Sequence, residues 1–281
     1  MITCNLMGGL GNQIFQIFAT ISYAIKSKNK FKFLNVSSIG SGSATIRNTF
    51  WNSFFNRLKA FLIDNIPQSI HVIREKGFTF NELPINEMVE RDCLIYGYFQ
   101  SYKYFHENYQ MICRIIGIAK MKEDIIQKLN LNNEYLKSCV SMHFRLGDYK
   151  KLQDYHPLAT YDYYKNCLNF IKENITEPYN ILYFCEDNDI DDVIPKINSL
   201  EKEFPHYKFI RGDNTLEDWE QMLFMSCCHH NIIANSSFSW WGAYFNTWND
   251  KIVCYPSVWF VAKAGHNTKD LCPPEWNKIN V

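Results

Sequence analysis

Apolar and polar residues near the N-terminus follow the pattern of a strand, a glycine turn and a helix. Residues 2–7 form a short, mostly apolar run that predicts a strand, and Gly8, Gly9 and Gly11 follow it directly. Apolar residues then recur at helical spacing at Ile14, Ile17, Phe18, Ile21 and Ile25. This spacing predicts a helix from about residue 12 to residue 26.

The C-terminal half alternates short apolar runs with amphipathic segments. The runs that predict strands cover residues 139–145, 179–185, 207–210, 231–234 and 251–255. Helices are predicted over 161–173, after a capping-box signature at Thr215–Asp218, and over 237–245. Strands that alternate with helices indicate a parallel sheet with right-handed crossovers.

The pattern divides the chain into two α/β lobes. A strand over 93–99 and a Tyr-rich helical stretch close the first lobe, and a Ser-, Gly- and Thr-rich segment over 35–49 predicts a surface loop. We therefore predict doubly wound lobes of residues 1–130 and 131–265, hinged near 120–138. The segment 266–281 is expected to pack back on the first lobe.

Composition adds an uneven distribution of charge to this picture. The 281 residues are 47% hydrophobic and carry no net charge, yet the first 63 residues contain seven Lys or Arg and no Asp or Glu. A basic N-terminal lobe suits a phosphate-bearing ligand or an acidic acceptor, and is equally typical of a solvated basic face. There is no run of about 18 apolar residues and no signal-peptide pattern, and the ten cysteines lack framework spacing. We expect reduced thiols, no membrane span and a cytoplasmic protein.

The glycine cluster Gly8–Gly11 lies between the first predicted strand and its helix. Glycines let the backbone approach a ligand closely, and the helix start offers amides to an anion. As a dinucleotide fingerprint the segment fails, because Ile14 occupies the third glycine position and no acidic residue follows about 20 positions later. The alternative is a tight structural turn.

A second candidate segment, His143–Tyr149, ends the strand over 139–145. Ligands of parallel sheets bind beyond the carboxyl ends of strands, and an arginine there can grip a diphosphate with two parallel hydrogen bonds. Arg145 is therefore the principal candidate for catalysis, and Asp148 either orients it or takes a proton. The alternative is a structural Arg–Asp pair.

A third segment, Asn235–Ala243, follows the strand over 231–234 and opens a helix. Serine hydroxyls and helix-start amides at this point predict an anion cradle. Trp240 and Trp241 fit the hydrophobic core equally well.

Together these segments resemble glycosyltransferase family 11, the α-1,2-fucosyltransferases. The similarity covers nearly the whole chain in order, and also includes residues 97–105, 216–219, 251–260 and 267–276. It implies an α/β fold of two Rossmann-like lobes with an inter-lobe cleft, the GT-B type. It further implies a GDP-sugar donor held mainly by the C-terminal lobe, acceptor binding by the N-terminal lobe, inversion at the sugar carbon, and no metal or cofactor.

The resemblance also implies roles for single residues. His143 and Arg145 would serve the donor diphosphate. The residues that would complete the donor site are Gly9, Gly11, Asn12, Asp187, Asn235, Ser237, Phe238 and Ser239. The family usually has a second arginine where this chain has Leu146.

The expected reaction is transfer of L-fucose from GDP-fucose to a hydroxyl, O-2 of galactose, on a glycan acceptor. Arg145, with His143 and the serine hydroxyls, would neutralise the departing GDP, since fixed donors aimed at developing charge are usually the largest catalytic term. Asp148 is the first candidate for the base, with Asp154, His156 or no side chain as alternatives.

Other functions compete with this expectation. They are transfer of another deoxysugar such as rhamnose, and a non-catalytic glycan- or nucleotide-binding module. The acidic run Glu186–Asp192 could be taken for a metal site, but the resemblance instead puts Asp187 near the nucleotide. No nucleic-acid motif is present, and the sequence leaves the oligomeric state open.

Overall fold

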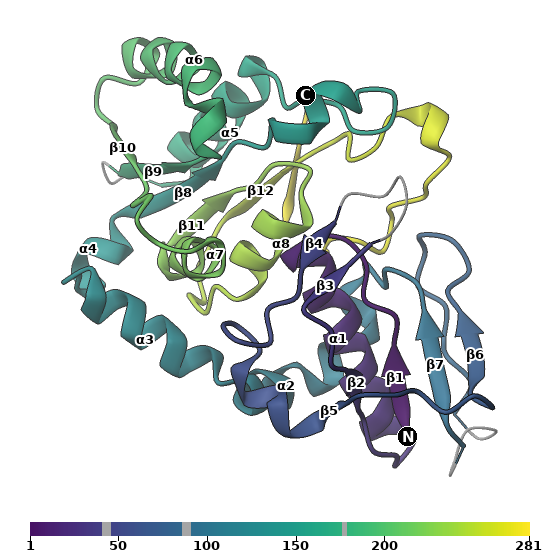
Figure 1. Cartoon of the computed structure of the whole chain (residues 1–281). Coiled ribbons are helices and arrows are strands. Elements are labelled where there is room, and N and C mark those ends of the chain that lie inside the picture. The colour runs from purple at the N-terminus through teal and green to yellow at the C-terminus, as the bar shows by residue number, and fades with distance from the viewer. Residues whose placement is uncertain (41–45, 86–90, 176–178) are drawn as a thin grey trace. The chain divides into compact units, whose positions relative to one another are not determined.

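The computed structural model describes residues 1–40, 46–85, 91–175 and 179–281, and its contacts divide the chain into two units (Figure 1). Unit 1 contains residues 1–120 and 267–273, and unit 2 contains residues 121–266 and 274–281. The division falls inside helix α3 (Ile118–Lys128). Of the predicted loop over 35–49, residues 41–45 lie outside the described part.

Unit 1 is built on a small parallel sheet with the order β1-β7-β6. Its strands are β1 (Ile2–Cys4), β6 (His71–Arg74) and β7 (Cys93–Tyr96). Two further pairs are β2 (Phe33–Leu34) with β5 (Leu62–Ile63), which is parallel, and β3 (Ser38–Ile39) with β4 (Arg47–Asn48), which is antiparallel. The prediction of a loop over 35–49 was therefore wrong at both ends, where two-residue strands pair.

The core of unit 1 forms around α1 (Leu10–Lys26), which is buried along nearly its whole length. Phe15 and Phe18 of this helix pack on Phe105, with ring centroids 5.9 Å and 5.5 Å apart. Helix α2 (Tyr109–Ile116) follows and ends at Gly117, whose φ of 89° suits glycine in a helix C-cap.

Unit 2 contains a six-stranded, fully parallel sheet with the order β10-β9-β8-β11-β12-β13. Its strands are β8 (Cys139–His143), β9 (Asn180–Phe184), β10 (Lys208–Arg211), β11 (His230–Ile232), β12 (Val253–Pro256) and β13 (Asn277–Ile279). The sequence did not predict β13, which is three residues long. The C-terminal segment is thus divided: residues 267–273 belong to unit 1 and β13 to the sheet of unit 2.

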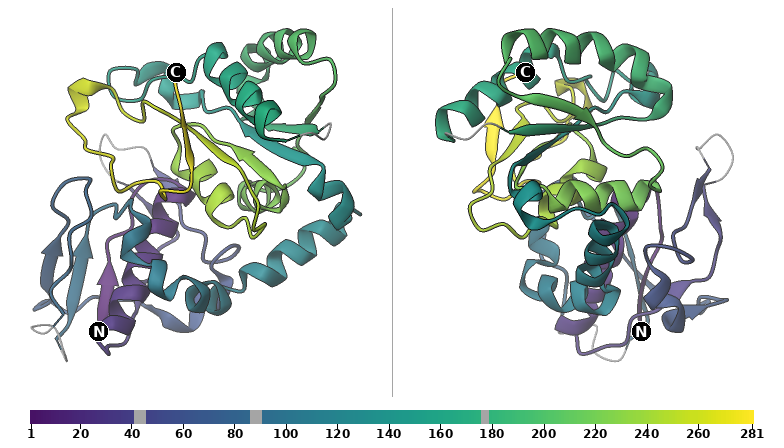
Figure 2. Two further views of the ribbon diagram at one scale, coloured as in Figure 1. Left: turned by 180° about the vertical axis from the view of Figure 1, so that it is seen from behind. Right: turned by 90° about the vertical axis from the view of Figure 1, so that its left-hand side faces the viewer.

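Helices cover both faces of this sheet (Figure 2). The helices of unit 2 after α3 are α4 (Asn133–Lys137), α5 (Tyr161–Asn174), α6 (Ile190–Glu203), α7 (Asp218–Cys227) and α8 (Ser237–Tyr244). α5 and α6 share a buried cluster with Val140 and Met142 of β8. α7 and α8 lie on the other face, where Asn231 donates to Ser141 Oγ and to the Met225 carbonyl.

The capping box of α7 differs from the predicted one. It joins Glu217 and Glu220: the side chain of each accepts the backbone N–H of the other. Thr215 instead binds Asp213, to which its N–H and hydroxyl donate at 2.8 Å and 2.6 Å. The predicted α/β class with parallel sheets is nevertheless confirmed, while the inter-lobe cleft and the functions of the two lobes stay predictions.

Candidate active site

The order of strands in unit 2 identifies the end of the sheet where a ligand fits best. From β8 the chain proceeds outward through β9 and β10, then returns to β11 on the other side of β8 and proceeds through β12 and β13. This is the order of doubly wound nucleotide-binding sheets, which bind ligands outside the carboxyl ends of the strands where the direction reverses. The segments that leave β8 and β11 therefore form the candidate site, and both were predicted from the sequence.

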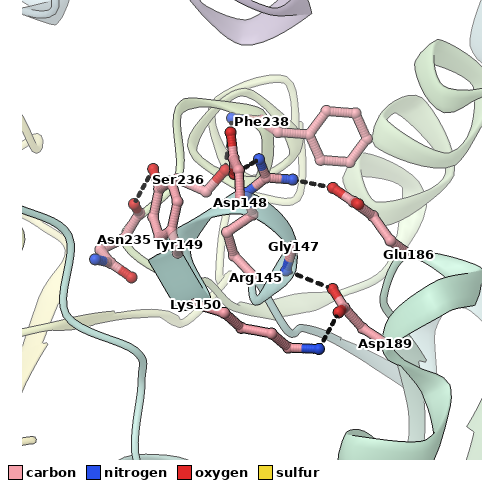
Figure 3. Close-up of polar contacts among 10 residues, drawn as sticks. All are labelled: Arg145, Gly147, Asp148, Tyr149, Lys150, Glu186, Asp189, Asn235, Ser236 and Phe238. Carbon is pink, nitrogen blue, oxygen red and sulfur yellow. Dashed lines mark hydrogen bonds and ion pairs between the residues drawn. The ribbon is translucent and has the colours of Figure 1, made fainter. Parts of the chain in front are cut away.

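Arg145 is the central cation of this edge, and its guanidinium contacts three side chains. Nη2 donates to Asp148 Oδ1 at 2.5 Å, and Nη1 forms an ion pair with Glu186 (Figure 3). The guanidinium carbon also lies 5.1 Å from the centre of the Tyr149 ring. The side chain is 21% exposed, so it is both held and accessible. The predicted Arg145–Asp148 pair is therefore present, and Glu186, which follows β9, is a partner that the sequence analysis missed.

A buried carboxylate fixes the turn that carries Arg145. The Gly147 N–H donates to Asp189 Oδ2 at 2.6 Å, and Lys150 Nζ donates to Asp189 Oδ1 at 2.7 Å (Figure 3). Gly147 has a φ of 36°, and a Cβ there would lie 3.0–3.2 Å from the Glu186 carboxylate. The positive φ favours glycine here, and an added Cβ would require the Glu186 side chain to shift slightly. The signal for Asp189 was the acidic run after the strand over 179–185.

His143 contributes no positive charge to the site. Its side chain is buried at the end of β8, with its ring centroid 5.5 Å from that of Phe238 on α8. Burial and the charge of Arg145 lower the pKa of His143 to about 3, so the imidazole is neutral at pH 7. Nδ1 has no hydrogen-bond partner among the described residues, and is a buried polar atom suited to a ligand contact.

The start of α8 is organised by its own side chains. Ser236 caps the helix, and its hydroxyl accepts the Phe238 N–H at 3.3 Å. Ser239 is buried and its hydroxyl donates at long range to the Ala234 and Ser236 carbonyls, whereas Ser237 is half-buried. Ser237, the first residue of the helix, is thus closer to solvent than Ser239, two positions further along.

Asn235 connects three segments beside this helix. Its Nδ2 donates to the Pro157 and Trp259 carbonyls, at 2.9 Å and 3.1 Å, and its own carbonyl accepts the Tyr149 hydroxyl at 3.2 Å. The side-chain Oδ1 is buried without a partner in the described part of the chain. Asn235 therefore has a structural function that the sequence did not indicate.

Asp187 lies after β9, next to Glu186. It forms an ion pair with Arg211 at the end of β10, and Asn214 Nδ2 lies 3.5 Å from Asp187 Oδ1. The carboxylate is 68% exposed and thus accessible to a ligand. Leu146 points elsewhere: it belongs to the hydrophobic cluster of unit 2, so this chain buries an apolar side chain where the family usually has a second arginine.

The predicted residues of unit 1 lie in and after the glycine turn. The positive φ of 74° occurs at Gly8, where a Cβ would lie 2.4 Å from the Asn12 amide nitrogen. Gly9 precedes α1 with an ordinary φ of −76°, and Gly11 is buried inside that helix. Asn12 Oδ1 accepts the Gln100 amide at 2.8 Å. The glycine that the turn requires is thus Gly8, which the sequence analysis did not select.

No group of three or more His, Cys, Asp or Glu side chains in the described ranges is arranged to hold a metal ion. None of the helices in these ranges is both long and apolar enough to cross a membrane.

Comparison with known proteins identifies the class. A family model described as "Glycosyl transferase family 11" matches residues 1–280. The protein is therefore a glycosyltransferase. It belongs to glycosyltransferase family 11, as its motifs indicated.

Two Escherichia coli proteins are similar over their full length. The chain is 28% identical to an "Alpha-1,2-colitosyltransferase" over 302 residues, which covers 99% of both chains. It is also 28% identical to the "O-antigen biosynthesis glycosyltransferase WbnK", with 98% of this chain and 99% of that protein covered.

Solved structures of fucosyltransferases are similar at low identity. A mutant of Arabidopsis thaliana FUT1 in complex with GDP has a TM-score of 0.48 at 8% identity, covering 90% of this chain and 69% of that one. POFUT1 in complex with GDP-fucose has a TM-score of 0.43 at 9% identity, covering 99% of this chain and 96% of that one.

Proposed function

We propose that this protein is an inverting α-1,2-fucosyltransferase that moves L-fucose from GDP-fucose to O-2 of a galactose in a glycan acceptor. Family membership supports the class of reaction. The similarity to an alpha-1,2-colitosyltransferase over the full length of the chain supports the linkage. The motifs of residues 143–149 and 235–243 support a nucleotide-diphosphate donor.

The observation that carries the proposal is the position of Arg145 at the reversal point of the sheet. A guanidinium there can bind diphosphate oxygens with two parallel hydrogen bonds. Its ion pairs with Asp148 and Glu186 fix its orientation before a donor binds. A diphosphate has more charge than the Glu186 carboxylate and competes with it for Nη1. Asp148 then stays as the partner that orients Arg145.

The reaction needs stabilisation of the charge that grows on GDP as the sugar leaves. Arg145 supplies a full charge, the Ser237 and Ser239 hydroxyls and the free amides at the start of α8 supply neutral donors, and Phe238 lines the pocket. His143 supplies a hydrogen bond without charge, because its pKa is low. No step in this scheme needs a metal ion or another cofactor.

The remaining predicted residues are proposed to contact portions of the donor that lie further from the reacting bond. Asp187 is proposed to accept hydrogen bonds from the ribose or base of the nucleotide. Gly9, Gly11 and Asn12 are proposed to shape the part of the donor site that unit 1 provides.

A donor other than GDP-fucose is the alternative that a specific observation favours. One full-length relative is named for colitosyl transfer, so a related deoxysugar such as colitose fits the same proposal. Transfer of rhamnose would fit the protein class but has no such support.

The donor can be tested by measuring Tm in the presence of GDP-, UDP-, dTDP- and CMP-sugars. We expect GDP-fucose and GDP to raise Tm and the other nucleotides to leave it unchanged, because only a ligand that binds the native state stabilises it. GDP release with a galactoside acceptor, with and without EDTA, tests the turnover and its metal independence. Stabilisation by UDP-sugars alone would overturn the donor assignment.

A further inference from the structure

His156 lies in the segment that follows the Arg145 turn and is held there by aromatic rings. Its imidazole stacks on the Tyr149 ring with centroids 4.3 Å apart and planes at 14°. The Phe260 ring packs on the imidazole at 5.2 Å and 48°. Since the Tyr149 ring also contacts the Arg145 guanidinium, His156 is one aromatic ring removed from the central cation of the site.

The backbone on both sides of this histidine is fixed as well. The His156 N–H donates to the Leu152 carbonyl at 2.9 Å, and the carbonyl of Pro157 accepts the Asn235 amide at 2.9 Å. The same amide binds the Trp259 carbonyl, next to Phe260. Asn235, which lies two residues before α8, thus joins the two segments that enclose the imidazole to the start of that helix.

The imidazole itself has an unused nitrogen. Nδ1 is buried and has no hydrogen-bond partner among the described residues, which is a costly state for a polar atom unless a ligand completes it. Burial lowers the pKa of His156, Asp148 raises it, and Arg145 and His266 lower it further. The ring is therefore neutral at pH 7 and able to take a proton.

The other candidates at this edge are poorer bases. Asp148 is ion-paired with Arg145 at 2.5 Å, so protonating it would sacrifice the partner that orients the guanidinium. Burial raises the pKa of Tyr149 to about 12, which keeps its hydroxyl protonated. Asp154 is exposed on the surface.

We propose that the His156 imidazole is the general base that takes the proton of the acceptor hydroxyl during sugar transfer. The hydroxyl oxygen forms the new bond to the sugar C1, and the bond from C1 to the diphosphate oxygen breaks, with its electron pair leaving on GDP. The hydroxyl proton moves to an imidazole nitrogen. This assignment rests on the proposed function as a sugar transferase, and it makes Asp148 a positioning residue.

The test compares His156→Gln, Asp148→Asn and His206→Gln with the unmodified protein. For each we would measure GDP release with a galactoside acceptor from pH 4.5 to 9, and the rise of Tm caused by GDP. His156→Gln should lower kcat at least 100-fold, as for loss of a general base, and leave the GDP-induced rise in Tm unchanged. His206→Gln, at an exposed histidine away from this cluster, is the matched control and should keep activity within about threefold.

The acidic side of the pH profile separates the two base candidates. In the unmodified protein kcat/KM should decrease at acidic pH. The midpoint of this decrease should lie below the ordinary pKa of histidine, because burial lowers the pKa of His156. Asp148→Asn should shift this fall to lower pH, because Asp148 raises the pKa of His156. In His156→Gln the fall should disappear, and in His156→Ala added imidazole should restore part of the rate.

Each outcome decides the assignment. A His156→Gln protein with activity within threefold of normal, or one that no longer responds to GDP, overturns it. So does an Asp148→Asn protein in which the acidic fall has vanished. If the unmodified protein transfers sugar from no nucleotide donor, the proposed function itself fails, and that result is visible before any variant is made.

Discussion

Two strand–turn–helix segments of this chain share a plan and differ in what holds the turn. In unit 1 the turn after β1 is closed by amides: Gln13 donates to the Gly8 carbonyl at 3.1 Å, and Gln16 bonds both the N–H and the carbonyl of Met7. In unit 2 the turn after β8 is held by ion pairs around Arg145 and by the Asp189 carboxylate.

The difference indicates which turn can exchange contacts with a charged ligand and which turn only fixes the backbone conformation. Neutral hydrogen bonds between backbone and amide side chains fix a conformation, and an approaching anion gains little by displacing them. An ion pair at a half-exposed edge can exchange one anion for another at small net cost. We infer that the Arg145 turn responds to the donor, and that the glycine turn provides a rigid surface.

The largest expected effect comes from removing the central cation of the charged turn. Arg145→Ala should lower kcat by about 10²–10³, or roughly 3 kcal/mol, because the leaving diphosphate loses its charged donor. Arg145→Lys is the matched control: it keeps the charge but not the paired hydrogen bonds, and should lose less. Steady-state GDP release measures both, and near-normal turnover of Arg145→Ala would refute the site.

The second effect concerns the carboxylate beneath the same turn. Asp189→Asn should lower the free energy of unfolding by about 2 kcal/mol, because the Gly147 N–H and Lys150 lose a charged acceptor that is itself buried. Asp192 also pairs with Lys150 but is 56% exposed, so Asp192→Asn should leave Tm nearly unchanged. Urea unfolding of the two variants gives the comparison, and equal stabilities would show that Asp189 does not fix the turn.

These residues also show how far the sequence alone could lead. Arg145, Asp148 and the α8 start were predicted because each follows an apolar run that ends a strand, and local pattern is enough for that. Glu186 and Asp189 were missed as partners because they lie about 40 residues later. Only the pairing of β8 with β9 brings them to Arg145 and Gly147, and periodicity does not report strand order.

Short elements were the other weakness of the sequence. β13 has three residues and β3 and β4 have two each, too few for an alternation of apolar and polar positions to be visible. The strand predicted over 2–7 ends at Cys4, because Met7 is bonded by the Gln16 side chain. Tertiary contacts, which the pattern does not contain, set these boundaries.

The neutral turn of unit 1 gives the third prediction, in a pair of adjacent glycines. Gly8→Ala should lower the free energy of unfolding by about 2 kcal/mol, because an L-residue is strained at a φ of 74° and its Cβ would clash with Asn12. Gly9→Ala should change it little, since Gly9 has an ordinary φ and no atom lies within 4 Å of the added Cβ. Thermal unfolding distinguishes them, and similar losses in both would mean that the strain is not located at Gly8.

The smallest effect concerns an acidic group of unit 1 that hydrogen-bonds to backbone amides. Glu75 Oε2 accepts the N–H groups of Tyr98 and Phe99, at 2.8 Å and 2.9 Å, and burial raises the pKa of Glu75 to about 6. Phe99 has a φ of 52°, which is unusual for a non-glycine residue, so the two bonds help to hold this bend.

A raised carboxyl pKa means that the folded state binds the proton more tightly than the unfolded chain. Stability from this group is therefore complete below the ordinary pKa of 4.5 and is lost as the pH rises through about 6.

Glu75→Gln keeps an oxygen for both N–H groups but cannot ionise. We expect it to be more stable than the unmodified protein by on the order of 1 kcal/mol at pH 7.5, and equally stable at pH 4.5. Urea unfolding at both pH values measures the difference, and a gap that is the same at both would show that the glutamate does not titrate in this range. Asp189→Asn removes a charged acceptor from the Arg145 turn and should therefore be less stable than the unmodified protein at pH 7.5, opposite in sign to Glu75→Gln.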